Sequence, residues 1–250
     1  MDINFKNKTI LITGGGSGLG MNIVRAFASY DANVAFTYNN SKSQADELIK
    51  QIGKDNVKAY QFDISKIDTI NSLLDQIIND FGNIDVLVNN AGIYPGKLIN
   101  DISEKDFEDM MNINSKGVFF LSRSVAQIMK NGSIINISSI NANNPGKTLA
   151  HYGMSKASIE MLTKSLALEY GPNIRVNCIA PGLIHRDGIE NAIPSWVDSY
   201  GERAALKRLV NPEDIANTCV FFASNLSAGI TGQTLTVDCG VSIAPYYNND

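Results

Sequence analysis

The chain has 250 residues, a formal net charge of -4, and 44% hydrophobic and 18% charged residues, which suits one α/β domain with a large core. Because there is neither an excess of positive charge nor a run of about 18 apolar residues, the sequence argues against nucleic-acid binding and against a membrane span. The first residues lack the apolar core of a signal peptide, and the cysteines and histidines lack metal-ligand spacing, so we expect a cytoplasmic protein with reduced thiols and no metal site.

The first apolar run, residues 10–12, is followed by clustered glycines and then by residues 21–28, a pattern typical of a strand, a tight turn and a helix. Glycines in such a turn permit positive φ and let the backbone approach a ligand closely. The N-terminus of the next helix offers unpaired N–H groups and the positive end of a dipole, which stabilise a pyrophosphate. A glycine turn without a ligand is the alternative, and four glycines between Gly14 and Gly18 argue against it.

Six further apolar runs predict strands, with segments of helical period between them. This alternation predicts a doubly wound parallel sheet of about seven strands, with right-handed crossovers and helices on both faces. Ligands of such sheets bind beyond the carboxyl ends of the strands, and Gly14, Asn90, Ser139 and Pro181 each follow a predicted strand. The predicted strands are residues 10–12, 34–36, 57–60, 86–88, 134–137, 176–179 and 234–237.

Tyr152 and Lys156 are four residues apart, so a helix would place both on one face. A nearby ammonium favours the phenolate and lowers the tyrosine pKa from its usual value of about 10. A phenol with a lowered pKa can exchange a proton with an alcohol or a ketone. The pair alone is weak evidence, because the solvated face of any long helix can carry this spacing.

Together with five further motifs, one of them the serine that follows the predicted strand 134–137, the pair makes the chain resemble the short-chain dehydrogenase/reductase family over about residues 8–241. The glycine turn matches the motif Thr-Gly-x-x-x-Gly-x-Gly, and residues 89–92 match Asn-Asn-Ala-Gly. The resemblance extends to the helical Asn114 and to Pro181-Gly182 after a later strand. It therefore covers nearly the whole chain, and residues 1–250 are expected to form a single Rossmann domain.

The resemblance implies hydride transfer between a nicotinamide cofactor and a ketone or secondary alcohol. Tyr152 would be the general acid in reduction and the base in oxidation, while Lys156 would hold the cofactor ribose and lower the tyrosine pKa. Ser139 would stabilise charge developing on the substrate oxygen, and Asn114 would hold a water that passes the proton onward. Ser139 is chosen over Ser138 because it lies thirteen positions before Tyr152, the family's usual interval.

Cofactor choice depends on the end of the second strand, where NAD-preferring folds commonly carry Asp or Glu. Here that position is Tyr38, with Lys42 close behind, so no carboxylate repels a 2′-phosphate and we favour NADP over NAD. Ser17 argues against this preference for NADP, because strongly NADP-selective relatives often have Arg at its position. Asp63 matches the family's adenine-contacting aspartate, although it could also cap the next helix. The resemblance places at the cofactor Gly14, Ser17, Gly18, Leu19, Gly20, Tyr38, Asn39, Asp63, Ile64, Asn90, Ala91, Gly92, Tyr152, Lys156, Pro181, Gly182 and Ile184.

Residues 189–207 do not follow the regular alternation of strands and helices, and they resemble the insertion that closes over substrate in relatives. Trp196 and Tyr200 are candidate pocket walls, or packing residues of that insertion. His151 is expected to line the entrance to the site.

Two departures from the family pattern lie near the site. His185 and Arg186 stand where relatives often carry Thr near the nicotinamide carboxamide, and Arg186 would meet an anionic substrate or lie in solvent. Cys239 replaces a glycine of the usual Asp-Gly-Gly, which leaves the conformation of that turn to be tested.

The nearest resemblance is to β-ketoacyl carrier-protein reductases, and sugar or polyol dehydrogenases are the alternative. A non-catalytic nucleotide-binding module is a third interpretation, but such a module needs no proton-transfer groups. Relatives are commonly homotetramers, and helices at 118–129 and 159–168 are apolar on more than one face, which fits burial at an interface. A carrier-protein reductase would need a basic docking face, for which the candidates are Arg123, Lys130, Lys207 and Arg208.

Overall fold

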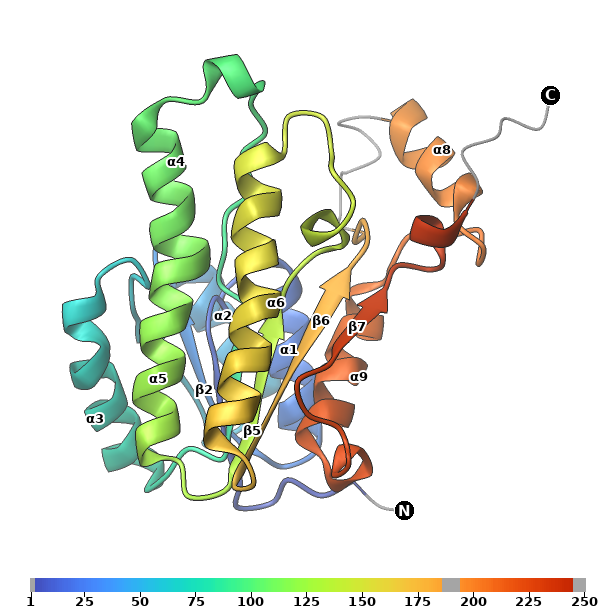
Figure 1. The fold of residues 1–250 in the computed structure, drawn as a ribbon. Coiled ribbons are helices and arrows are strands. Elements are labelled where there is room, and N and C mark those ends of the chain that lie inside the picture. The colour runs from blue at the N-terminus through green and yellow to red at the C-terminus, as the bar shows by residue number, and fades with distance from the viewer. Residues whose placement is uncertain (1–2, 186–193, 245–250) are drawn as a thin grey trace.

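The computed structural model describes residues 3–185 and 194–244. Its seven strands form one sheet in the order β3-β2-β1-β4-β5-β6-β7, and every neighbouring pair is parallel (Figure 1). The seven predicted strands are confirmed, because a parallel sheet covered on both faces needs near-continuous apolar runs. The strands are β1 (Thr9–Ile12), β2 (Asn33–Tyr38), β3 (Val57–Gln61), β4 (Val86–Asn89), β5 (Gly132–Ile137), β6 (Ile174–Pro181) and β7 (Thr234–Val237).

The strand order reverses at β1, which pairs with β2 on one side and with β4 on the other. Ile12 is level with Phe36 of β2 and with Val88 of β4, so the three strands end close together. The connections from β1 and β4 leave in opposite directions, which opens a crevice beyond their carboxyl ends. The topology therefore brings the loop after Ile12 next to the loop after Asn89.

Helices cover both faces of the sheet, as predicted. In Figure 1, α3, α5 and α6 lie in front of the strands, whereas α1, α2 and α9 lie behind them, and α4 continues upward from α5. Two separate hydrophobic cores fill the spaces between the helices and the sheet. The helices are α1 (Gly18–Ser29), α2 (Lys42–Ile52), α3 (Ile70–Phe81), α4 (Glu104–Met111), α5 (Val118–Ile128), α6 (Ala150–Tyr170), α8 (Pro194–Arg203) and α9 (Pro212–Ala223).

The first strand shows how these cores are built. Successive strand side chains point to opposite faces, so Ile10 and Ile12 join the core that contains Phe27 of α1, while Leu11 joins the core that contains Leu121 of α5. All five side chains are 0% exposed. Truncating one buried side chain of this size to alanine lowers the free energy of unfolding by about 2–5 kcal/mol. The strand ends that carry the site are therefore held by a tightly packed core.

Helix α4 begins at the carboxyl edge with a reciprocal cap. Ser103 Oγ accepts from Asp106 N at 3.2 Å, and Asp106 Oδ2 accepts from Ser103 N at 3.0 Å. Two otherwise unpaired N–H groups are thereby satisfied, which fixes the start of the helical segment that leads to Asn114.

Within residues 3–185 and 194–244, no helix combines the length and the hydropathy needed to cross a membrane. In the same ranges, no three His, Cys, Asp or Glu side chains are grouped so that they could hold a metal ion. Cys178, Cys219 and Cys239 are free thiols with buried side chains.

Candidate active site

The loop between β1 and α1 is shaped by glycines at places where a side chain would not fit. Gly14 has a φ of +67°, in the left-handed region that glycine tolerates best. A Cβ atom on Gly20 would overlap the carbonyl oxygen of Gly14 and lie 2.8 Å from Asn90 Nδ2. Helix α1 therefore starts directly against the loop, with residues 17–19 exposed or partly exposed at its N-terminus, where unpaired N–H groups suit an anion.

Thr13 joins this loop to the loop after β4. Its Oγ1 accepts from the N–H groups of Asn90 and Ala91, both at 3.0 Å, and Asn90 Nδ2 donates to Thr13 O at 2.9 Å. Because Thr13 is 0% exposed, these bonds are buried and hold the two loops in fixed positions. Sequence reasoning did not include Thr13 among the site residues, although its place at the start of the glycine motif was an available signal.

Asn114 lies in a π-helical turn, Asn112–Gly117, between α4 and α5, and such turns occur frequently at functional sites. Its side chain is 1% exposed. Its Oδ1 accepts from Ile93 N at 2.9 Å, and its Nδ2 donates to Ile93 O at 2.8 Å and to Ser155 Oγ at 3.1 Å. Asn114 therefore fixes the segment after Gly92 relative to α6.

Ser138 and Ser139 both follow β5, but their side chains have different partners. Ser138 Oγ donates to the carbonyl of Lys156 at 3.0 Å and is buried, so it tethers α6 to the sheet. Ser139 Oγ accepts from Asn141 N at 3.1 Å, at the start of the short helix Ile140–Ala142. The Ser139 hydroxyl is also close enough to the phenol of Tyr152 to lower the Tyr152 pKa. Of the two serines, Ser139 is therefore the one beside the Tyr152 phenol, and its role towards a substrate stays a prediction.

Tyr152 and Lys156 share one face of α6. Lys156 Nζ lies 5.8 Å from the centre of the Tyr152 ring and donates to Ile137 O at 2.8 Å. A Cβ atom on Gly92 would lie 3.5 Å from Lys156 Nζ and 3.1 Å from Asn114 Oδ1. The four residues predicted to carry the proton transfer therefore lie together beyond the carboxyl ends of β4 and β5.

Burial dominates the protonation of this pair. Desolvation raises the pKa of Tyr152; the Ser139 hydroxyl acts in the opposite direction, and the neighbouring Tyr94 raises the pKa further. Desolvation lowers the pKa of Lys156 to about 8.

The expectation that Lys156 lowers the tyrosine pKa is contradicted, since the Tyr152 pKa is raised above 10. The reason is the order in which the two groups titrate. A lysine with a pKa of about 8 has lost its charge before a phenol with a pKa above 10 loses its proton, so it cannot stabilise the phenolate.

His151 does not line an entrance, contrary to expectation. Its side chain is 1% exposed, and neither imidazole nitrogen has a partner among the described residues. The reason is helical geometry: His151 is one turn before Ser155, on the face of α6 that is packed inward towards Asn114.

Tyr94 is the exposed neighbour of Tyr152 instead. The two rings meet edge to face, with centroids 6.4 Å apart, and Tyr94 is 57% exposed. Sequence reasoning missed this residue, although it stands only two positions after the Asn-Asn-Ala-Gly motif.

The end of β2 carries the residues expected to choose between NADP and NAD. Tyr38 is the last residue of the strand and is buried, while Asn39 is exposed. Lys42 Nζ pairs with Asp46 Oδ2 at 2.6 Å, and this hydrogen bond raises the lysine pKa. The charge of Lys42 is therefore present but shared with an acidic neighbour one turn along α2.

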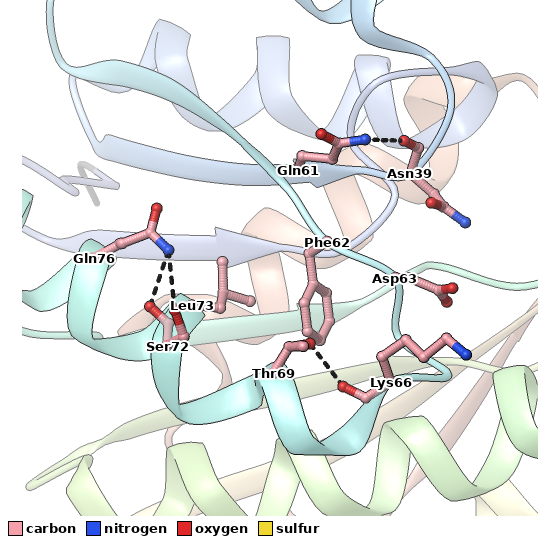
Figure 2. Close-up of a pocket in the computed structure, with 9 residues that line it drawn as sticks. All are labelled: Asn39, Gln61, Phe62, Asp63, Lys66, Thr69, Ser72, Leu73 and Gln76. Atoms are coloured by element: carbon pink, nitrogen blue, oxygen red, sulfur yellow. Dashed lines mark hydrogen bonds between the residues drawn. The ribbon is translucent and has the colours of Figure 1, made fainter.

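A cavity of about 310 Å³ lies between the end of β3 and α3, with Asn39, Asp63 and Lys66 along one side (Figure 2). Asp63 Oδ1 accepts from Ser65 N at 3.0 Å and from Ser65 Oγ at 2.7 Å. The next short helix begins after Lys66, so Asp63 closes a loop rather than capping that helix, which corrects the alternative given above. Ile64 belongs to the core, so it presents only its backbone to a ligand.

The end of β6 completes the carboxyl edge. Pro181 is the last residue of β6, Gly182 N donates to Val237 O at 3.0 Å, and Ile184 forms a bridge with Val210. Cys239 has a φ of +56°, which explains why glycine is usual at this position: the backbone is left-handed here.

The segment 189–207 is described only in part. Helix α8 occupies Pro194–Arg203, whereas Arg186 and the side chain of Trp196 lie outside the described residues. Tyr200 packs against the core on the α1 and α9 side of the sheet, which matches the packing alternative for this residue.

Comparison with known proteins agrees with this architecture and site. A family model described as Enoyl-(Acyl carrier protein) reductase matches residues 14–242. A 3-oxoacyl-(acyl-carrier-protein) reductase of Staphylococcus epidermidis is 36% identical over 243 residues, which cover 94% of this chain and 99% of that protein. The corresponding reductase of Thermotoga maritima is 36% identical over 251 residues, covering 96% and 100%.

Solved structures give the same result. A short-chain dehydrogenase/reductase of Brucella melitensis, described as a glucose/ribitol dehydrogenase, superposes with a TM-score of 0.92 at 30% identity and covers 96% of this chain and 99% of that one. A short-chain dehydrogenase/reductase of Serratia marcescens gives 0.90 at 32% identity, covering 95% and 99%. The chain therefore belongs to the short-chain dehydrogenase/reductase family, and it is an oxidoreductase that acts on alcohol and carbonyl groups.

Proposed function

We propose that this protein is a reductase that uses NADPH to convert the 3-oxo group of an acyl chain into a hydroxyl group. The observation that carries the proposal is the buried phenol of Tyr152, whose raised pKa keeps it protonated at neutral pH. A protonated phenol is the form required of a general acid in carbonyl reduction. The names of the Staphylococcus epidermidis and Thermotoga maritima relatives support the same reaction.

In the proposed mechanism, Ser139 hydrogen-bonds the substrate carbonyl oxygen and stabilises the negative charge that develops on it. Tyr152 delivers its proton to that oxygen. Lys156, which is mostly charged at neutral pH given its pKa of about 8, holds the cofactor ribose. Asn114 keeps the segment after Gly92 in place and orders the water through which the phenol regains its proton.

The residues of the crevice fit a dinucleotide. The absence of side chains at Gly14 and Gly20 leaves the backbone open to a pyrophosphate at the N-terminus of α1. The cavity beside Asn39, Asp63 and Lys66 would receive the adenosine half. When bound, the reduced nicotinamide supplies the hydride, and Pro181, Gly182 and Ile184 would flank it at the end of β6.

The preference for NADPH rests on the end of β2. No carboxylate follows Tyr38 before Lys42 in the sequence, and Lys42 could meet a 2′-phosphate if it moves away from Asp46. Replacement of Lys42 by Ala should then weaken NADPH binding more than NADH binding, by about fivefold or less, because an exposed ion pair contributes about 1 kcal/mol or less. Equal weakening of both cofactors would remove Lys42 from the 2′-phosphate site.

The basic residues that could dock a carrier protein lie on different parts of the molecule. Lys130 follows α5 and precedes β5, at the amino end of the strands, whereas Lys207 and Arg208 follow α8 near the carboxyl end. Arg208 is also paired with Asp214 at 2.6 Å. Because the basic candidates do not form one face, a small free ketone or polyol is the second candidate substrate.

We also propose that residues 189–207 cover the substrate and that the chain forms a single domain. Four copies of this domain would assemble as a cytoplasmic homotetramer. Helices α5 and α6 lie side by side on one face (Figure 1) and expose large apolar side chains there. Phe119 is 45% exposed, Met161 61% and Leu168 88%, and burial of such a patch supports association. A stable monomer in sedimentation velocity would contradict the tetramer.

The test of the proposed function is the loss of reduced-nicotinamide absorbance with NADPH and NADH in parallel. The substrates are an acetoacetyl thioester on acyl carrier protein, the same group on coenzyme A, and a panel of keto sugars. We expect turnover of the thioesters with NADPH. Turnover of the coenzyme A thioester but not of the carrier-bound one would favour a free substrate, and turnover of keto sugars alone would favour the second candidate.

A further inference from the structure

Tyr94 is held in place by hydrogen bonds on both sides of it in the chain. Ile93, on one side, makes two backbone hydrogen bonds to Asn114 at 2.8 and 2.9 Å. Lys97, on the other side, donates from its backbone to Thr148 O at 2.9 Å. The loop that carries Tyr94 is therefore attached at one end to the π turn and at the other to the segment that precedes α6.

The contact with Thr148 fixes the loop closely. Thr148 has a φ of +71°, a conformation that a β-branched residue adopts only when its surroundings enforce it. A Cβ atom on Gly96 would lie 3.1 Å from Thr148 Oγ1. The backbone of Gly96 therefore packs directly against the side chain of Thr148. A loop held this way positions the Tyr94 side chain reproducibly instead of leaving it to sample many orientations.

The ring of Tyr94 stands beside the catalytic phenol. It meets the Tyr152 ring edge to face at an interplanar angle of 65°, with centroids 6.4 Å apart. The two side chains are also close enough for the Tyr94 phenol to raise the Tyr152 pKa. A ketone whose carbonyl group reaches Tyr152 between Ser139 and the Tyr94 ring must place one of its substituents along that ring.

The exposure of Tyr94 distinguishes this role from core packing. Tyr94 is 57% exposed, whereas Tyr38 and Tyr60 are 9% and 8% exposed and belong to the cores. More than half of the surface of Tyr94 is thus exposed to solvent beside the reacting group, where a substrate would cover it.

We propose that the Tyr94 ring is the wall of the carbonyl site that selects substrates, favouring ketones whose substituent is compact or planar and excluding branched ones. Planar groups stack on or meet the edge of an aromatic ring favourably, while a tertiary carbon would collide with it. The inference rests on the proposed function, because it assigns a substrate preference to the same catalytic site. It makes Tyr94 a specificity-determining residue, and Tyr152 remains the proton donor.

The test compares ethyl acetoacetate with ethyl pivaloylacetate, which differ by a methyl and a tert-butyl group on the ketone. Tyr94→Ala should raise KM for ethyl acetoacetate about fivefold, in line with the loss of one aromatic contact. It should also shift the ratio of kcat/KM towards ethyl pivaloylacetate at least about tenfold. Tyr94→Phe keeps the ring and should retain the wild-type preference.

Tyr30→Ala is the matched control, since Tyr30 is 36% exposed and its ring packs on Phe5, away from the site. NADPH affinity, measured by fluorescence, and Tm should be the same in Tyr94→Ala and in wild type. An unchanged preference between the two esters in Tyr94→Ala would overturn the proposal. So would a loss of preference that appears equally in Tyr30→Ala, or one that tracks a fall in Tm.

A second measurement separates this inference from the proposed function. Calorimetry of ethyl acetoacetate binding to the NADPH complex of Tyr152→Phe needs no turnover. If the double variant Tyr94→Ala/Tyr152→Phe binds the ester more weakly than Tyr152→Phe, the role of the Tyr94 ring as a wall of the site is supported, even if the wild-type enzyme does not reduce these esters. Equal binding of the ester with and without the Tyr94 ring rejects the proposed role of Tyr94. Ester binding by a wild-type enzyme that does not reduce the ester rejects the proposed reduction alone.

Discussion

Lys156 donates a hydrogen bond from its ammonium group to the backbone carbonyl of Ile137, the last residue of β5, at 2.8 Å. The lysine is 6% exposed, and burial lowers its pKa to about 8 from an ordinary value of 10.5. A positive charge that the reaction needs is therefore kept in a place that disfavours it. This arrangement therefore lowers the stability of the fold as long as the lysine is charged.

Lys156→Met should abolish activity and stabilise the fold at pH 7 by about 1–3 kcal/mol. The folded-state pKa is below the unfolded-state pKa, so below pH 8 the folded state carries the full cost of burying the charge. That cost is about 3 kcal/mol from the size of the shift, and the lost hydrogen bond to Ile137 offsets about 1 kcal/mol of the gain. Denaturant unfolding at several pH values measures the difference.

The pH dependence makes this prediction specific. Between pH 8 and 10.5 the unfolded state binds more protons, so the wild type gains stability with rising pH and the advantage of Lys156→Met disappears. Lys164→Met, at an exposed position of the same helix, should show no such trend. A difference between Lys156→Met and wild type that stays constant across this range would show that desolvation is not its cause.

The pH dependence of kcat/KM should differ between the two directions. Reduction needs a protonated Tyr152 and a charged Lys156, so its rate should be level below pH 8 and fall above it as the lysine titrates. Oxidation needs the phenolate, whose pKa is raised above 10, and the charged Lys156, so its rate should rise up to about pH 8 and then level off as the lysine loses its charge. Initial rates in both directions with the same alcohol and ketone pair provide the test, and a reduction rate that holds level to pH 10 would be inconsistent with it.

Ser139→Ala and Ser138→Ala should separate chemistry from structure in neighbouring residues. Ser139→Ala should lower kcat by about 100-fold or more, since one oxyanion-stabilising donor contributes on that scale, while Tm changes little. Ser138→Ala breaks a buried bond to Lys156 O, so it should lower stability by about 1–3 kcal/mol while keeping measurable turnover. If Ser138→Ala proved the more damaging to kcat, the assignment would have to move to Ser138.

His151→Leu should leave stability unchanged or raise it by about 1 kcal/mol. Both imidazole nitrogens are buried without a partner among the described residues, and an apolar replacement removes that cost. Thr163→Val is the contrasting variant on the same helix, because Thr163 Oγ1 makes two buried bonds at 2.8 Å. We expect Thr163→Val to be destabilising, and a larger loss in His151→Leu would mean that the histidine has a partner, such as an ordered water.

The strands and the main site residues could be predicted because each leaves a local trace in the sequence. Strands buried on both faces are apolar throughout, so β1 and β4 stand out, and the glycine loop and Tyr152 with Lys156 follow fixed spacings. The parallel topology then places the carboxyl ends of the strands at one edge. Local pattern and chain order are enough for this part of the molecule.

The remainder depends on contacts between distant segments. The π turn around Asn114 is held by Ile93 and Ser155, and the bond network of Thr13 reaches across to Asn90. The direction of the Tyr152 pKa shift was predicted wrongly because the spacing from Lys156 shows a nearby amine but not that burial takes away its charge. Burial is a property of the whole fold, and short motifs do not report it.

Tyr152 is the residue proposed to exchange the proton with the substrate oxygen. The most direct test of this role is Tyr152→Phe, with NADPH affinity measured by fluorescence and turnover measured by nicotinamide absorbance in the same preparation. We expect NADPH to bind within about threefold of wild type while turnover falls at least about 100-fold, the lower range for loss of a general acid. Turnover retained within tenfold of wild type would contradict the account.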